Sequence, residues 1–272
     1  MKKCAFFLAL MLAPPAFADE PVELTFVANE GVIIRHGDRA VAIDTPASNS
    51  YDGTFALPSA AMLDAMTTGG DPVGELDAIL FTHIHGDHFD AAGAAAIIGG
   101  QPSPRPHILG GNQVIDAFIE AGGDDDQAMR PRSVDGSCET VDQSECRYTL
   151  TMPVPHSNRI ALDIDARPLF HTDGIEHWTY RVEMGGVSVL HLGDTQPQMA
   201  DFSIWDGVDF DVILYPYWFV QMAEGVAFLE AHPEARAIAF HIPAAVTDAQ
   251  IAEGLNGAEY LHTEGETRIL SE

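Results

Sequence analysis

The alternation of apolar and polar positions along the chain predicts two meanders of strands, one in each half. In each meander, three segments rich in β-branched residues are separated by turns such as Asn29-Glu30-Gly31 and Gly185-Gly186. Such short connections between consecutive strands indicate antiparallel pairing. The six predicted strands span residues 22–29, 31–37, 39–45, 159–171, 178–184 and 187–195.

Strand and helix segments alternate after each meander. Residues 76–82 and 210–216 are too apolar for half-exposed strands and too short for core helices, so we expect strands buried on both faces. Two meanders followed by strand–helix units predict an α/β fold, in which two sheets pack face to face with helices outside. Further strands are predicted at 107–111 and 237–243, and helices at 60–66, 91–98, 112–123, 220–232 and 247–255, with Ser59, Asp90 and Thr247 as N-caps.

The chain shows no internal repeat, no low-complexity linker and no break in composition, which favours one domain over residues 19–272. Residues 123–148 form an acidic, turn-rich excursion within it. This excursion contains Cys138 and Cys146, which either form a disulfide in an oxidising compartment or remain two free thiols.

The first eighteen residues have the pattern of a cleavable signal peptide. Lys2 and Lys3 precede a short apolar run, and Ala16-Phe17-Ala18 matches an A-x-A cleavage site. We therefore expect cleavage near Ala18 and a periplasmic or secreted protein; an uncleaved membrane anchor is the alternative. No later apolar run approaches the ~20 residues of a spanning helix, so no membrane span is expected in the mature protein.

The formal net charge of −28 restricts the classes of partner. An acidic surface repels phosphate backbones and anionic lipids, which disfavours nucleic acid and membrane surfaces and favours a small-molecule substrate. The sequence gives no indication of the oligomeric state.

The segment THIHGDHFD, residues 82–90, has the spacing of a metal site. In an extended segment His83, His85 and Asp87 alternate at i, i+2 and i+4, so their side chains leave on one side. Two imidazoles and a carboxylate form a zinc-type donor set, and His88, which points elsewhere, could reach a second ion. Gly86 is expected to permit the sharp turn between them.

This motif, H-x-H-x-D-H at the end of a strand, resembles the hallmark of the metallo-β-lactamase superfamily. Three other segments are similar to that family's motifs in the same order: IDT at 43–45, LGDT at 192–195 and FHIP at 240–243. The resemblance covers nearly all of the mature chain and implies the αββα four-layer sandwich. It is closer to the lactonase and phospholipase-like branch than to true β-lactamases, because no long antibiotic-recognition loop is visible.

The resemblance also implies which residues bind two divalent ions, for which zinc fits best and manganese or iron are alternatives. One histidine ligand stays open between two candidates. His171 matches the lactonase and phospholipase-like branch, and His177 matches the shorter spacing of the lactamase and glyoxalase branches. The implied ligands are His83, His85 and His171 for the first ion, Asp87, His88 and His241 for the second, and Asp194 between the two.

The implied chemistry is hydrolysis of an ester, lactone, amide or phosphoester bond by a hydroxide shared between the two ions. Asp87 would orient that hydroxide and Asp194 would hold the spacing, which makes them the candidate catalytic residues. His191, on the same strand as Asp194, is either an outer hydrogen-bond partner of a ligand or a core residue. A single-iron oxygenase of the same fold and a non-catalytic metal-binding periplasmic protein are the alternative functions.

Overall fold

The structure, a computed structural model, describes residues 20–131, 148–152 and 162–270. The predicted signal peptide and the two cysteines of the acidic excursion lie outside the described residues. None of the helices in these ranges combines the length and the apolarity that a membrane crossing requires.

The first sheet is built from the N-terminal half of the chain and one C-terminal strand. Its members β14, β1, β2 and β3 are antiparallel neighbours, and β3, β4, β5 and β6 are parallel neighbours in that order. The meander is therefore followed by the predicted parallel strands. The bounds are β1 Val22–Ala28, β2 Gly31–His36, β3 Arg39–Ile43, β4 Ala78–Leu80, β5 His107–Leu109, β6 Ala128–Met129 and β14 Thr267–Ile269.

The second sheet repeats this arrangement with later strands. Its strands β7, β8, β9 and β10 are antiparallel, and β10, β11, β12 and β13 are parallel. The bounds are β7 Tyr148–Met152, β8 Leu162–Pro168, β9 Trp178–Met184, β10 Val187–His191, β11 Val212–Pro216, β12 Arg236–Phe240 and β13 Glu259–Tyr260.

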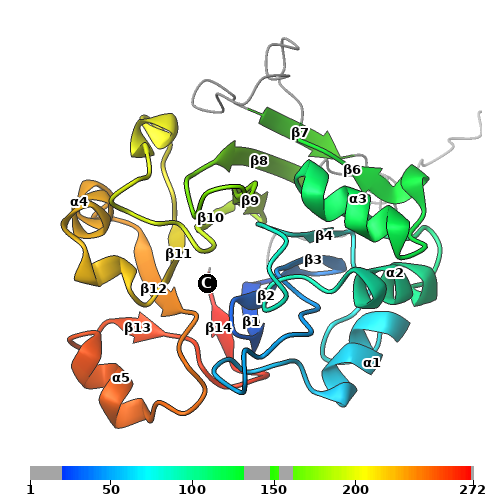
Figure 1. The fold of residues 1–272 in the computed structure, drawn as a ribbon, viewed down its shortest axis with the longest axis horizontal. Helices are drawn as coiled ribbons and strands as arrows, with labels where there is room; N and C mark the ends of the chain where they lie inside the picture. The colour runs from blue at the N-terminus through cyan, green and yellow to red at the C-terminus, as the bar shows by residue number, and fades with distance from the viewer. Residues whose placement is uncertain (1–19, 132–147, 153–161, 271–272) are drawn as a thin grey trace, which may run out of the picture.

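Helices cover the outer faces of both sheets, which gives the predicted αββα sandwich. Helices α1, α2 and α3 lie on one side of the strands, and α4 and α5 lie on the opposite side (Figure 1). One apolar cluster fills the space between the sheets, and a separate cluster lies under each layer of helices. The bounds are α1 Ala60–Thr68, α2 Ala91–Gly100, α3 Asn112–Glu120, α4 Ala223–Ala231 and α5 Asp248–Gly254, with 3₁₀ turns at Asp125–Gln127, Phe202–Trp205 and Phe219–Gln221.

Two of the three predicted N-caps are confirmed. The side chain of Ser59 accepts a hydrogen bond from the first turn of α1, and Thr247 forms a capping box with Gln250. Asp90 occupies the N-cap position of α2, but its side chain accepts no hydrogen bond from the first turn of the helix, so the predicted side-chain cap was wrong. The strands β6, β7, β13 and β14 were not predicted; all four lie at sheet edges, β6, β13 and β14 are only two or three residues long, and β14 pairs with β1 at the other end of the chain.

Tyr180 on β9 links the two sheets directly beneath the predicted metal motif. Its fully buried hydroxyl donates a 2.8 Å hydrogen bond to the carbonyl of Phe81, the residue that follows β4. Replacing Tyr180 by phenylalanine leaves that buried carbonyl unsatisfied, which costs about 1–3 kcal/mol. We expect this loss in the free energy of unfolding, measured by denaturant titration. Tyr215→Phe, at a buried ring for which the described structure shows no hydroxyl hydrogen bond, is the control; an equal loss there would contradict the assignment.

Candidate metal centre

Four loops, all following strand ends, bring the predicted site residues together. The motif His83–His88 follows β4, His171 follows β8, Asp194 follows β10 and His241 follows β12. Because the carboxyl ends of the parallel strands meet at one edge of each sheet, the packed sheets join these loops at one place. All seven predicted ligands lie in this place.

The first group of donor atoms comes from three histidines and Asp194. His85 Nδ1 lies 2.9 Å from His83 Nε2 and 3.2 Å from His171 Nε2. Asp194 Oδ2 lies 3.8 Å from His83 Nε2 and 3.7 Å from His171 Nε2. Four side chains thus direct one atom each toward a common point.

The second group contains two histidines and two aspartates. The other oxygen of Asp194, Oδ1, lies 3.0 Å from His241 Nε2 and 3.4 Å from His88 Nε2. Asp87 Oδ2 lies 3.4 Å from His241 Nε2 and 3.6 Å from His88 Nε2. Asp194 therefore gives one carboxylate oxygen to each group.

The donor atoms fit metal ions in spacing and in chemistry. Ligands held about 2.0–2.2 Å from one ion lie about 3–3.6 Å apart, which is close to the separations in both groups. In the second group His88 Nε2, His241 Nε2 and Asp194 Oδ1 are buried and have no hydrogen-bond partner among the described residues. Buried polar atoms need such a partner, and a cation at their common point would satisfy all three.

Outer hydrogen bonds orient the histidines for this purpose. His171 Nδ1 lies 2.9 Å from the carbonyl of Asp194, so it carries the proton and leaves Nε2 free to bind an ion. His88 Nδ1 lies 3.0 Å from Asp44 Oδ2. Asp44 is held in turn by the backbone and hydroxyl of Thr82, both at 2.7 Å, so the IDT segment supports the centre from outside.

The structure places His171 in the centre and His177 beside it. His177 Nδ1 lies 3.0 Å from the carbonyl of Leu169, and Nε2 has no hydrogen-bond partner among the described residues. That nitrogen faces Gly193, where an added Cβ would lie 2.6 Å away. Burial lowers the pKa of His177 to about 3, so the ring is a neutral packing residue.

Several residues at the centre have left-handed backbone conformations. Asn29, Asp44 and His241 have φ angles of 52°, 50° and 59°, which non-glycine residues adopt rarely and which cluster at functional sites. Gly86, which was expected to provide a sharp turn, does not have a positive φ. Its role is spatial, because an added Cβ would lie 2.7 Å from Cβ of Asn49.

The electrostatics of the two groups differ. Burial lowers the pKa of His83 well below its usual value and lowers that of His171, so both rings are neutral and able to bind a metal. Burial alone would also lower the pKa of His88, but the carboxylates of Asp194 and Glu30 outweigh it and raise that pKa. The second group therefore lies in the more negative potential, which favours a cation.

The sequence analysis missed Asn29, Glu30 and Phe55 as residues of the centre, whereas Trp218 follows a buried strand, where an aromatic residue either lines a pocket or packs in the core. Asn29 donates hydrogen bonds to the carbonyl of Asp87 at 3.2 Å and to its Oδ2 at 3.3 Å. Glu30 is completely buried next to the second group. Phe55 and Trp218 pack their rings against His241, with centroids 4.3 and 5.0 Å away. Turn residues and aromatic residues do not form a metal-ligand motif in the sequence. Their place at the centre is therefore visible only from their burial and contacts in the folded protein.

His191 is a buried core residue and not the outer partner of a ligand, because no hydrogen bond joins its ring to any of the seven predicted ligands in the described part of the chain. Its Nε2 lies 3.1 Å from the carbonyl of Glu30, and its Nδ1 accepts a 3.2 Å hydrogen bond from the backbone of Gly193. Both ring nitrogens are therefore occupied by backbone, and His191 ties the turn before β2 to the loop that carries Asp194.

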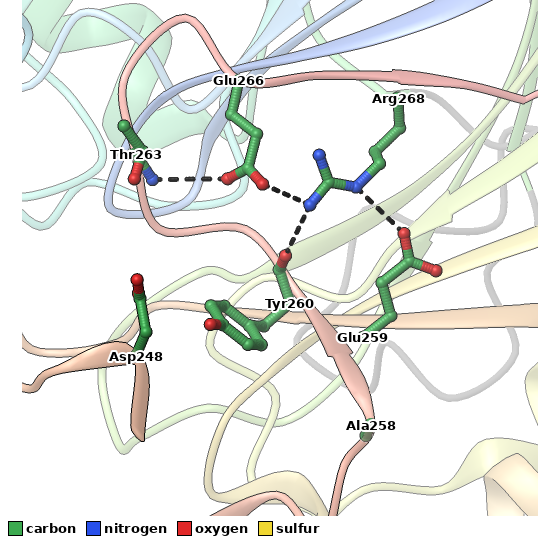
Figure 2. Close-up of a pocket in the computed structure, with 7 residues that line it drawn as sticks. All are labelled: Asp248, Ala258, Glu259, Tyr260, Thr263, Glu266 and Arg268. Atoms are coloured by element: carbon green, nitrogen blue, oxygen red, sulfur yellow. Dashed lines mark hydrogen bonds and ion pairs between the residues drawn. The ribbon is translucent and has the colours of Figure 1, made fainter. Parts of the chain in front are cut away.

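A separate hollow of about 260 Å³ lies beside α5, β13 and β14 and contains none of the predicted ligands. Figure 2 shows Arg268, the one cationic side chain among its lining residues, held between the carboxylates of Glu259 and Glu266. Because two carboxylates already neutralise it, this hollow offers no free cation to a ligand. The lining residues are Asp248, Ala258, Glu259, Tyr260, Thr263, Glu266 and Arg268.

Comparison with known proteins identifies the fold by structure alone. No family model matches the chain. No curated protein matches its sequence either.

Solved structures match along nearly the whole chain. An isothiocyanate hydrolase from Delia radicum gut bacteria is 14% identical over 92% of this chain and 100% of its own, with a TM-score of 0.60. The metallo-β-lactamase fold protein YhfI from Bacillus subtilis is 12% identical over 92% and 99%, with a TM-score of 0.58. CmlA, a diiron β-hydroxylase from Streptomyces venezuelae, is 13% identical over 93% of this chain and 54% of its own, with a TM-score of 0.51. This chain is thus similar in structure to a hydrolase, to a protein named only for its fold and to a β-hydroxylase, so the likeness establishes a fold and leaves the reaction to the site.

Proposed function

We propose that this chain, which has the metallo-β-lactamase fold, is a metal-dependent hydrolase that binds two divalent ions. The observation that carries the proposal is Asp194, whose two oxygens face two separate groups of donor atoms. His83, His85 and His171 would hold one ion, Asp87, His88 and His241 the other, and Asp194 would lie between them. Histidine nitrogens with carboxylate oxygens suit zinc best, and they also accept manganese or iron.

Two ions bound in these positions would supply Lewis acidity to a carbonyl or phosphoryl oxygen and would lower the pKa of a bound water. Neighbouring side chains orient the ligands and shield them from water. Asn29 fixes the carboxylate of Asp87, so that Asp87 is oriented at the position where a nucleophile would be held. Phe55 and Trp218 pack against the ring of His241. Because both rings are apolar, they would keep water away from that side of the second group.

The accessible side of the centre is that of the first group. His85 and His171 are half-buried, whereas His83, His88 and His241 are buried, so a substrate would approach over the first two. The acidic surface disfavours polyanionic substrates, since the net charge is −28. We therefore propose a small neutral ester, lactone or amide, with a phosphoester as a further class. We also propose export, from the signal-peptide pattern of residues 1–18.

A second candidate is an iron-dependent oxygenase, which the likeness to a diiron β-hydroxylase favours. The two proposals differ in the metal that the protein retains after purification without added metal. Zinc or manganese supports hydrolysis, and tightly bound iron supports oxygenation.

Chelation provides the direct test of hydrolysis. With a panel of chromogenic esters, a lactone, an amide, a phosphodiester and an isothiocyanate, we expect at least one to be hydrolysed. Metal removal should reduce that rate by at least about 100-fold, because it removes several kcal/mol of transition-state stabilisation. It should also lower the melting temperature by about 5–10 °C, since bound ions stabilise only the folded chain. Zinc or manganese should restore both. Hydrolysis that persists undiminished after complete removal would refute the proposal.

A further inference from the structure

Glu30 is a fully buried carboxylate to which the chemistry proposed above gives no role. It lies in the turn between β1 and β2, with none of its surface exposed. Neither of its oxygens has a hydrogen-bond partner among the described residues. Within the same residues it forms an ion pair with His88, whose Nδ1 lies 3.3 Å from Oε2. Burying a carboxylate in this way costs several kcal/mol unless a positive charge lies nearby.

The surroundings of Glu30 are those of the second donor group. Single donor atoms of Glu30, His88, Asp194 and His241 all lie within 4.8 Å of one another. Asp44 Oδ2 and Glu30 Oε2 both face the same nitrogen of His88, at 3.0 and 3.3 Å. His88 is thus held at Nδ1 by two carboxylates while its Nε2 points toward Asp87 and Asp194.

The other described neighbours of Glu30 do not provide its buried carboxyl group with a hydrogen-bond donor. Asp44 and His191 form a third group with it, but both nitrogens of His191 are occupied by backbone atoms, and Asp44 accepts from Thr82 and His88. A separate ion in that third group would have to break these bonds. The carboxyl group of Glu30 is therefore directed at the second group.

The backbone of the turn supports the same assignment. The carbonyl of Asn29 accepts a 3.0 Å hydrogen bond from the amide of His241, and the carbonyl of Glu30 receives His191 Nε2. Gly31 leaves no room for a side chain, because an added Cβ would lie 3.0 Å from the carbonyl oxygen of Asp44. The turn is consequently fixed against the loops that carry the second group's ligands.

We propose that Glu30 is a positioning residue of the second metal position: together with Asp44 it fixes the ring of His88, and its buried carboxylate strengthens binding of the second ion selectively. This inference rests on the two-ion centre proposed above. Glutamine at this position keeps the volume and loses the charge, so Glu30→Gln separates the electrostatic role from packing.

The test is competitive transfer of zinc from the purified full-length proteins to a colorimetric chelator, which yields two dissociation constants. For Glu30→Gln we expect one of the two dissociation constants, that of the second ion, to rise about 10–100-fold while the other stays unchanged, which is the usual effect of losing a carboxylate that orients a metal ligand. Glu230→Gln, which removes the same charge from an exposed position on α4, is the matched control and should behave as wild type.

The outcomes distinguish the two proposals. The role of Glu30 is overturned if wild type and Glu30→Gln bind both ions equally well, or if the variant binds both ions more weakly by the same factor. Either result leaves the proposed two-ion centre in place. Wild type that binds no metal would overturn the proposed function and this inference with it. If Glu30→Gln fails to fold by circular dichroism, Glu30→Asp decides, since it keeps the charge and displaces it. If folded Glu30→Asp binds the second ion more weakly and the first ion as wild type does, the proposed role of Glu30 is supported. If both dissociation constants are unchanged, that role is refuted.

Discussion

Replacing Asp194 by asparagine should abolish hydrolysis, with a fall in kcat/KM of at least about 10³-fold, equivalent to roughly 4 kcal/mol. Asparagine retains the size of the side chain but offers one neutral oxygen in place of two charged ones. Because Oδ2 faces His83 and His171 while Oδ1 faces His88 and His241, the substitution weakens both donor groups together. Bound metal, measured by elemental analysis, should fall below one ion per chain.

The control for this substitution is Asp206→Asn, in an exposed turn of the same loop region. It removes an equal charge without touching the centre and should keep full activity and metal content. An Asp194→Asn protein that retains both ions and hydrolyses its substrate at the wild-type rate would show that the shared carboxylate does not organise the centre.

Replacing His171 by alanine should lower the metal content, and replacing His177 by alanine should leave it unchanged. Loss of His171 removes one of three nitrogens from the first group, so we expect about one ion to be lost and activity to fall by about 10²-fold. Loss of His177 removes a buried ring whose Nδ1 is bonded to the carbonyl of Leu169, so we expect both ions to remain and stability to fall by about 1–3 kcal/mol.

Each variant serves as the control for the other, because both histidines lie between β8 and β9 and differ mainly in direction. Elemental analysis and denaturant titration on the two proteins separate ligand from packing residue. Loss of metal in His177→Ala with retention in His171→Ala would reverse the assignment.

The fold and the motif residues could be predicted because their signals are local. Strand periodicity located the two meanders, and the alternation of His83 and His85 directed two donors to one point. The same argument was wrong for Asp87, because the chain turns at residues 86–88 and Asp87 faces the second group together with His88. Sequence spacing could not choose between His171 and His177, since both follow the same strand. The choice depends on which ring faces Asp194, and that is fixed by the carbonyl of Asp194 bonding to His171 Nδ1.

The contributions of Asn29 and Glu30 could not be predicted for a physical reason. A polar turn between two strands is normally exposed, and these residues become buried only when the second sheet packs against the first. The aromatic contacts of Phe55 and Trp218 with His241 likewise join segments far apart in the chain. Such residues belong to the site through tertiary packing, so the sequence motif marks only part of it.

The measurement that tests the central claim most directly is the metal content of the wild-type protein, purified without chelator and analysed for all transition metals. The geometry around Asp194 predicts about two zinc or manganese ions per chain. A protein that takes up no metal under replete conditions would contradict the account, and a single tightly bound iron would redirect it from hydrolysis to oxygen chemistry.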